Sequence, residues 1–198
     1  QNQLYKIRND LNVKPYSSHL SNVNSYPIYR ESDTKIYIPR YYGLETIGKL
    51  DKNNLSKGNQ IDLPFKGKLF DYQTNIIQKY IDSIGESGGG LLDVEPGKGK
   101  TVMALNIISK LKVKTLVIVH KTFLMNQWRD RILEFIPDAS IGYIQGDKIE
   151  VEDKDIVIGM LQSISQREYD LKIFKDFGFT IIDECHHIGA ETFSRSLF

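Results

Sequence analysis

The sequence predicts an open α/β fold, in which a parallel sheet is covered by helices on both faces. The first observation is that short apolar segments alternate with amphipathic segments from residue 69 onward. The second is that the apolar segments are nearly unbroken hydrophobic runs, as expected for parallel strands that are buried on both faces. In an open fold of this kind, ligands bind at the carboxyl ends of the strands.

The expected elements follow in order along the chain. Residues 69–84 have apolar side chains at helical spacing and predict a helix, which the glycine-rich stretch after it ends. The remaining elements are a short strand at 90–94, a helix at 100–112, a strand at 115–120, a helix at 121–136 and strands at 140–144, 155–160 and 177–184. A charged loop is expected at 145–155. We expect the α/β domain to cover residues 61–198.

A small module is expected in residues 1–60, because residues 43–68 are polar, weakly periodic and typical of a linker. Residues 1–68 hold 11 Lys and Arg against 6 Asp and Glu, and seven of the eleven tyrosines. One interpretation is a surface that stacks bases and contacts phosphates. The other, which we favour, is that the tyrosines form the core of a small strand-rich module.

Composition excludes several classes of protein. Hydrophobic residues make up 40% and charged residues 26% of the 198 positions, the balance of a soluble globular protein. No apolar run approaches the ~20 residues that span a bilayer, so no membrane contact is expected. Cys185 is the single cysteine, which excludes an internal disulfide and a cysteine-rich zinc site. We expect an intracellular protein, with nuclear and cytoplasmic (viral factory) locations both open. The net charge of +1 is too small to indicate nucleic-acid binding.

The stretch VEPGKGKT, residues 94–101, resembles a phosphate-binding loop, G-x-x-x-x-G-K-[ST], with Val94 in place of the first glycine. It lies between an expected strand and an expected helix, the context that such a loop requires. Its glycines let successive N–H groups face an anion at the positive end of a helix. The motif therefore predicts ATP binding by Glu95, Pro96, Gly97, Lys98, Gly99, Lys100 and Thr101. Lys100 would reach the phosphates and Thr101 would bind Mg²⁺, whereas we expect the Lys98 side chain to point to solvent.

The stretch TIIDECHH, residues 180–187, offers the acids that phosphate-loop chemistry needs. Asp183 follows three residues of an expected strand and would hold Mg²⁺ directly or through water. Glu184 would orient the water that attacks the γ-phosphate. A zinc site at Cys185, His186 and His187 is not expected, because consecutive residues leaving a strand point in alternating directions.

Together PGKGKT and DECH resemble motifs I and II of superfamily 2 helicases and translocases, in the DExH group. The resemblance covers about residues 69–198 and implies a RecA-like lobe. The segments FDYQ, VIVHKTFLMNQW and VIGMLQSIS resemble further motifs of this superfamily. They imply that Gln73 reads the adenine edge, that His120, Lys121, Thr122, Gln162 and Ser163 lie near a DNA or RNA backbone, and that His186 couples the ATP site to a partner lobe. The detailed residue pattern of these motifs resembles the branch of superfamily 2 that contains the XPB-type repair helicases. Helicases of large DNA viruses are related to that branch.

The resemblance also implies a second RecA-like lobe that supplies arginine fingers, so we expect the chain to be the first part of a longer protein and largely inactive when isolated. A nucleotide-binding regulatory module without motor activity is the alternative, and Glu184 favours the motor. DNA and RNA stay equally open as partners. Trp128 lies at the apolar spacing of an amphipathic helix, and we expect it in the core and not on a base-stacking surface.

Overall fold

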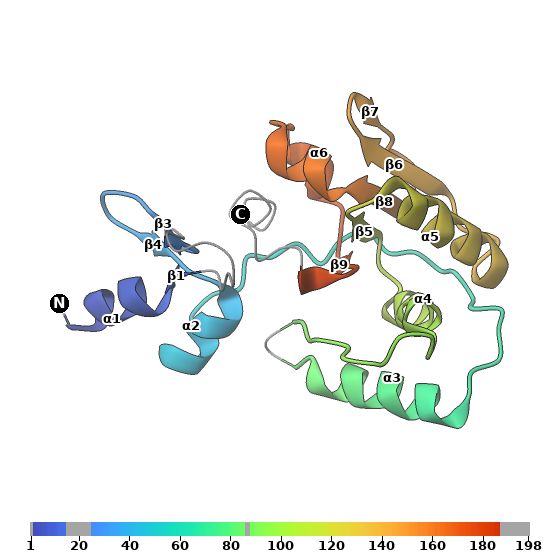
Figure 1. Ribbon diagram of the computed structural model, residues 1–198, viewed down its shortest axis with the longest axis horizontal. Helices are drawn as coiled ribbons and strands as arrows, with labels where there is room; N and C mark the ends of the chain where they lie inside the picture. The colour runs from blue at the N-terminus through green and yellow to red at the C-terminus, as the bar shows by residue number, and fades with distance from the viewer. Residues whose placement is uncertain (1, 15–24, 86–87, 187–198) are drawn as a thin grey trace, which may run out of the picture. The chain divides into compact units, whose positions relative to one another are not determined.

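The computed structural model describes residues 2–14, 25–85 and 88–186. These residues form two compact units, which Figure 1 shows as ribbons. The units meet in sequence between Asn53 and Asn54, whereas the sequence placed the end of the first module at residue 60. Tyr16, one of the seven tyrosines of residues 1–68, and His187 lie outside the described residues.

The first unit combines two helices with two very short strand pairs. Its elements are α1 (Asn2–Asp10), β1 (Asn12–Val13), β2 (Tyr26–Pro27), β3 (Arg30–Glu31), β4 (Ile36–Tyr37) and α2 (Arg40–Thr46). Strands β1 and β2 pair antiparallel, as do β3 and β4. The expected strand-rich tyrosine core is wrong: among the described tyrosines of this unit only Tyr26 is buried, while Tyr5, Tyr37 and Tyr41 are exposed. The strands are too short to bury a row of rings. The Tyr42 hydroxyl instead donates to Asp10 Oδ2 at 2.8 Å, on the surface.

The second unit contains a five-stranded sheet in the order β7-β6-β8-β5-β9. Its strands are β5 (Thr115–Val119), β6 (Ile141–Gln145), β7 (Lys148–Ile149), β8 (Ile156–Met160) and β9 (Phe179–Ile182). The pairs formed by β5, β6, β8 and β9 are parallel, and β7 alone is antiparallel to its neighbour. All residues of β5 and β8 are buried, as expected for central strands covered on both faces. The predicted α/β class is confirmed.

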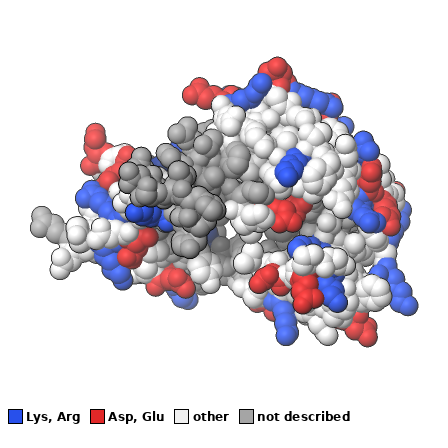
Figure 2. All heavy atoms as spheres, viewed as in Figure 1, with Lys and Arg blue, Asp and Glu red and all other residues white. Residues whose placement is uncertain are grey.

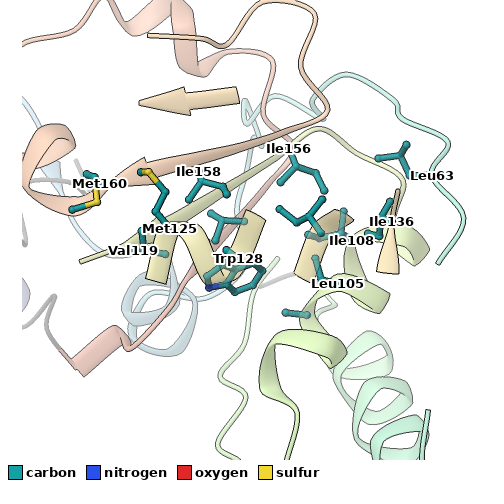
Figure 3. Packing of buried hydrophobic residues seen from close by; sticks show 13 residues of the cluster. Leu63, Leu105, Ile108, Val119, Met125, Trp128, Ile136, Ile156, Ile158 and Met160 are labelled. Carbon is teal, nitrogen blue, oxygen red and sulfur yellow. The ribbon is translucent and has the colours of Figure 1, made fainter. Parts of the chain in front are cut away.

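Helices α3 (Asp71–Ser83), α4 (Lys100–Leu111), α5 (Thr122–Phe135) and α6 (Leu161–Gln166), with the 3₁₀ turn Leu171–Phe174, complete the described part of this unit. The main core lies where α4 and α5 pack on the sheet, and Figure 3 shows its side chains. Its members include Leu105 and Ile108 from α4, Met125, Trp128 and Ile132 from α5, and Val117, Val119, Ile156 and Ile158 from the strands. The apolar period of α5 therefore faces the sheet, and Trp128 is only 2% exposed, which confirms its core assignment.

Residues 54–68 of the predicted linker belong to the second unit. Gln60 forms an isolated antiparallel bridge with Val113, and the N–H of Asn59 donates to the carbonyl of Asp176 at 2.8 Å. Phe65 stacks on Phe135 with ring centroids 5.4 Å apart. Backbone pairing and aromatic stacking do not depend on an apolar period, so a polar, aperiodic segment can still be bound in this way.

Two further expectations differ from the structure. Residues 90–94 form no strand, because their backbone pairs with no other segment that the structure describes. Leu91 is 73% exposed. A strand exists only through its partner's hydrogen bonds, which an apolar run alone does not supply. The charged loop 145–155 contains β7, which turns back on β6 at Gly146, where φ is +58°. Within the described residues, no helix is long and apolar enough to cross a membrane.

Candidate nucleotide-binding site

The glycine-rich loop leads directly into α4. Gly97 and Gly99 have φ angles of +80° and +79°, the left-handed region that glycine enters without strain. Gly99 is the N-cap of α4. The first hydrogen bond of the helix is donated by the N–H of Met103 to the carbonyl of Gly99 at 3.0 Å. The N–H groups of the first turn have no intrahelical partner and carry the positive end of the helix dipole. This end of α4 is thus built to receive an anion.

The lysine and threonine of the motif begin α4. Lys100 Nζ donates to the carbonyl of Val94 at 3.2 Å, so the side chain folds back over the loop. Both Lys100 and Thr101 line a cavity of about 530 Å³. The other residues of the loop, Glu95, Pro96 and Lys98, are exposed, which agrees with a Lys98 side chain in solvent.

Gln73 lies beneath the loop and is 4% exposed. Its Oε1 accepts from the N–H of Phe70 at 3.0 Å, as a residue at the third position of a helix does when it caps the helix start. Its Nε2 donates to the carbonyl of Lys98 at 3.1 Å, and the Tyr72 hydroxyl donates to the same carbonyl at 3.0 Å. Helix α3 is therefore bonded to the phosphate loop. Support of the loop is a function of Gln73 that the sequence did not indicate.

The acidic residues follow the carboxyl end of β9. The N–H of Asp183 donates to the carbonyl of Ile118 at 3.0 Å, which continues the pairing with β5. Asp183 Oδ2 accepts from the indole Nε1 of Trp128 at 2.8 Å. Glu184 has a φ of +53°, a conformation that costs a non-glycine residue roughly 1–3 kcal/mol. Its Oε2 lies 3.4 Å from His186 Nδ1.

The cavity brings the two motifs together. Lys100, Thr101, Asp183, Glu184 and His186 all line it, although they come from segments more than 80 positions apart. Its volume of about 530 Å³ is within the range of small-molecule sites. Residues 90–94 form part of its wall. Tyr80 also lines it, and burial raises the pKa of the Tyr80 phenol, so this group stays neutral near pH 7.

The donors and acceptors in the cavity suit a magnesium–nucleotide complex. In the described residues, no group of three or more His, Cys, Asp or Glu side chains is arranged to hold a metal ion. Magnesium in nucleotide sites does not need such a group, because it is held by one or two protein oxygens together with phosphates and water. Asp183 and Thr101 can supply those oxygens, while Lys100 and the start of α4 suit the phosphates.

The residues expected near a nucleic-acid backbone lie at the carboxyl ends of β5 and β8. Gln162 Nε2 donates to the carbonyl of His120 at 2.8 Å, which ties the two segments together. The hydroxyl of Ser163 accepts from the N–H of Gly146 at 2.9 Å. Lys121 and Thr122 are exposed at the start of α5. The side chains of Gln162 and Ser163 therefore hold together the segments that follow the strands at this edge of the sheet. The side chains of Lys121 and Thr122 face solvent.

One feature beside this edge was not predicted. Phe123 is 62% exposed, and Lys121 Nζ lies 6.0 Å from its ring centroid. An exposed aromatic ring next to a lysine is a common element of surfaces that stack bases and contact phosphates. The signal was visible in the sequence as Lys-Thr-Phe at the start of an amphipathic helix, but exposure could not be inferred from it.

This fold and this site define a RecA-like ATP-binding lobe of the superfamily 2 helicase type, as the motifs predicted. The chain belongs to the family described as "Type III restriction enzyme, res subunit", which matches residues 66–197. It is 38% identical over 197 residues to "Putative ATP-dependent RNA helicase L396" of Acanthamoeba polyphaga mimivirus, with 96% of the chain aligned. It is 32% identical over 151 residues to "DNA 3'-5' translocase XPB2" of Sulfurisphaera tokodaii, with 73% of the chain aligned. Viral and XPB-like relatives were both expected.

Solved structures show the same fold. The UvsW helicase from bacteriophage T4 superposes with a TM-score of 0.62 at 15% identity, covering 100% of this chain and 82% of that one. The SWI2/SNF2 ATPase core of Sulfolobus solfataricus in complex with dsDNA gives 0.56 at 21% identity, covering 71% of this chain and 31% of that one. The chain spans 38% of the mimivirus protein and 32% of the archaeal translocase.

Proposed function

We propose that this chain is the ATP-hydrolysing lobe of a helicase or translocase that acts on DNA or RNA. The observation that carries the proposal is the shared cavity, where Lys100 and Thr101 of the phosphate loop meet Asp183 and Glu184. A pure nucleotide-binding module has no need of Glu184. Glu184 has no evident function in binding phosphate, but a carboxylate here suits the orientation of an attacking water.

Each residue has a distinct part in this mechanism. The first-turn N–H groups of α4 and the Lys100 ammonium hold the β- and γ-phosphates by charge-assisted hydrogen bonds. Thr101 and Asp183 would hold an Mg²⁺ ion, which would supply positive charge against the phosphates. The Glu184 carboxylate orients the water for attack in line with the leaving group. His186, 3.4 Å from Glu184, can restrain this carboxylate and connect it to a second lobe.

A second RecA-like lobe is part of the proposal, since a superfamily 2 site needs arginines to neutralise the γ-phosphate during transfer. Such arginines contribute ~10³–10⁵ in rate in related enzymes. The nucleic acid would cross the edge formed by Lys121, Thr122 and Phe123. Figure 2 shows Lys and Arg interspersed with Asp and Glu over the visible face of the described residues. The contact with nucleic acid would therefore depend on the positions of individual side chains and not on an excess of positive charge. The relatives' names mention both RNA and DNA, so they do not decide between the two. No zinc is required by this mechanism.

The experiment measures binding of a fluorescent ADP analogue to the 198-residue chain. Lys100→Ala should weaken binding by at least tenfold without lowering the melting temperature, because its charge acts on the phosphates. Lys98→Ala is the matched control, since Lys98 is an exposed lysine in the same loop. The affinity of this variant for the ADP analogue should differ from that of wild type by less than threefold. Equal affinities of wild type and Lys100→Ala would refute the assignment of the loop.

A further inference from the structure

The indole N–H of Trp128 reaches out of the hydrophobic core to the acid of the nucleotide site. The ring is 2% exposed and lies in the core cluster with Met125 and Ile132 of the same helix. Figure 3 shows Trp128 and Met125 in this cluster. Its Nε1 donates to Asp183 Oδ2 at 2.8 Å, over a sequence separation of 55 residues. Trp128 also lines the cavity itself.

The choice of acceptor distinguishes this contact from ordinary core packing. A phenylalanine or leucine would fill apolar space without bringing a donor, whereas a buried indole N–H needs a partner. Here the partner is a carboxylate, so the bond is charge-assisted and stronger than one to a neutral carbonyl. It also restrains the carboxylate, because one oxygen is held by a ring that is itself locked in the core.

We propose that Trp128 is a positioning residue that fixes the Asp183 carboxylate for magnesium binding. With Oδ2 held by the indole, Oδ1 is the carboxylate oxygen that would be left for a cation. The backbone of Asp183 is fixed separately by its bond to Ile118. Main chain and side chain of the acid are thus both oriented before nucleotide arrives. This inference rests on the proposed function, since it assigns Trp128 as the residue that orients Asp183 of the proposed nucleotide site.

The first experiment tests the hydrogen bond. Trp128 is the single tryptophan of the chain, so the ¹⁵N-labelled protein gives one indole N–H signal in an NMR spectrum. We expect a downfield proton shift in wild type, an upfield move in Asp183→Asn, and a further change when ADP and Mg²⁺ are added together. An indole signal that is the same in wild type and Asp183→Asn would overturn the proposal, and this result needs no tryptophan variant.

The second experiment tests positioning against simple packing. Trp128→Phe keeps an aromatic ring and removes the donor, and it should raise the Kd for Mg²⁺ in the presence of ADP by about 10–100-fold, the usual effect of losing a partner that orients a metal ligand. Binding of ADP in excess EDTA should stay within threefold of wild type. Ile132→Val is the control, because it removes a methyl group from the same buried face of α5 without touching Asp183. Melting temperatures are measured for both.

The outcomes separate the two proposals. If Trp128→Phe binds Mg²⁺ with wild-type affinity, or if Ile132→Val loses as much Mg²⁺ affinity as Trp128→Phe, then Trp128 contributes only to core packing and the proposal is wrong. Wild-type protein that binds no ADP at all would instead refute the proposed function, while the indole signal would still report whether the bond to Asp183 exists.

Discussion

The side-chain amide of Gln73 donates to the carbonyl of Lys98 at 3.1 Å and thereby bonds helix α3 to the phosphate loop. Gln73 is buried under the loop, while the cavity opens beside the start of α4. A side chain expected to read adenine is therefore also a support for the backbone that faces the phosphates.

We predict that Gln73→Ala weakens the binding of both ADP and inorganic tripolyphosphate, by about tenfold each, because a loose loop aligns its N–H groups less well. A side chain that only reads the base would affect ADP alone. Isothermal titration calorimetry of the two ligands distinguishes these cases. Gln78→Ala is the control, since Gln78 is an exposed glutamine of the same helix that bonds to Asp82.

Gly99 should tolerate substitution less well than Gly97, although both have φ near +80°. A Cβ at Gly99 would lie 2.5 Å from Gln73 Nε2, whereas a Cβ at Gly97 would meet nothing within 4 Å. Gly97→Ala should cost roughly 1–2 kcal/mol of unfolding free energy from the left-handed backbone alone. Gly99→Ala should cost more, because it adds displacement of the Gln73 amide. Urea unfolding measures both, and equal losses would contradict the role of the Gln73 contact.

Glu184→Gln should separate binding from hydrolysis. In a protein that carries both lobes, the variant keeps the shape of the side chain and loses the charge that orients water, so kcat for ATP hydrolysis should fall by about 10²–10³-fold. The affinity for ATP should change little. Glu134→Gln, on the exposed face of α5, serves as the control. If Glu184→Gln hydrolyses ATP at nearly the wild-type rate, another group must orient the attacking water.

The sequence predicted those parts of the molecule that are encoded locally. The phosphate loop is a contiguous motif, and the strands β5 and β8 are apolar runs that are buried whatever their neighbours are. Residues 90–94 looked similar, but a strand also needs a paired neighbour, and that depends on distant residues. The bond between Trp128 and Asp183 depends in the same way on how α5 packs on the sheet. No local pattern encodes the direction in which an indole N–H points.

The bridge between Gln60 and Val113 also joins residues that are far apart in the sequence. Both residues are in segments without a clear period, so their pairing is set by the packing of the whole unit. The first unit was hard to predict for a related reason. Its strands are two residues long, and such short segments carry too few positions to show an alternation of apolar and polar side chains.

The last prediction concerns the first unit and its basic, tyrosine-containing surface. Tyr5, Tyr37 and Tyr41 are exposed, so the interpretation as a stacking and phosphate-contacting surface fits the described residues better than a tyrosine core. Each phosphate contact that is lost should reduce the slope of log Kd against log salt concentration by about 0.7–0.9. Deleting residues 1–53 should therefore weaken binding of a single-stranded oligonucleotide and flatten its salt dependence by about one unit or more.

The deletion must end at Asn53, because the second unit begins at Asn54 and Gln60 pairs with Val113. A deletion to residue 60 would damage the lobe and confuse lost contacts with lost structure. Lys121→Ala in the full 198-residue chain is the comparison, since it removes one exposed cation from the lobe and should lower the slope by about 0.7–0.9. A salt slope that is unchanged after removal of residues 1–53 would mean that the first unit makes no contact with phosphates, and its exposed tyrosines would then need a different partner.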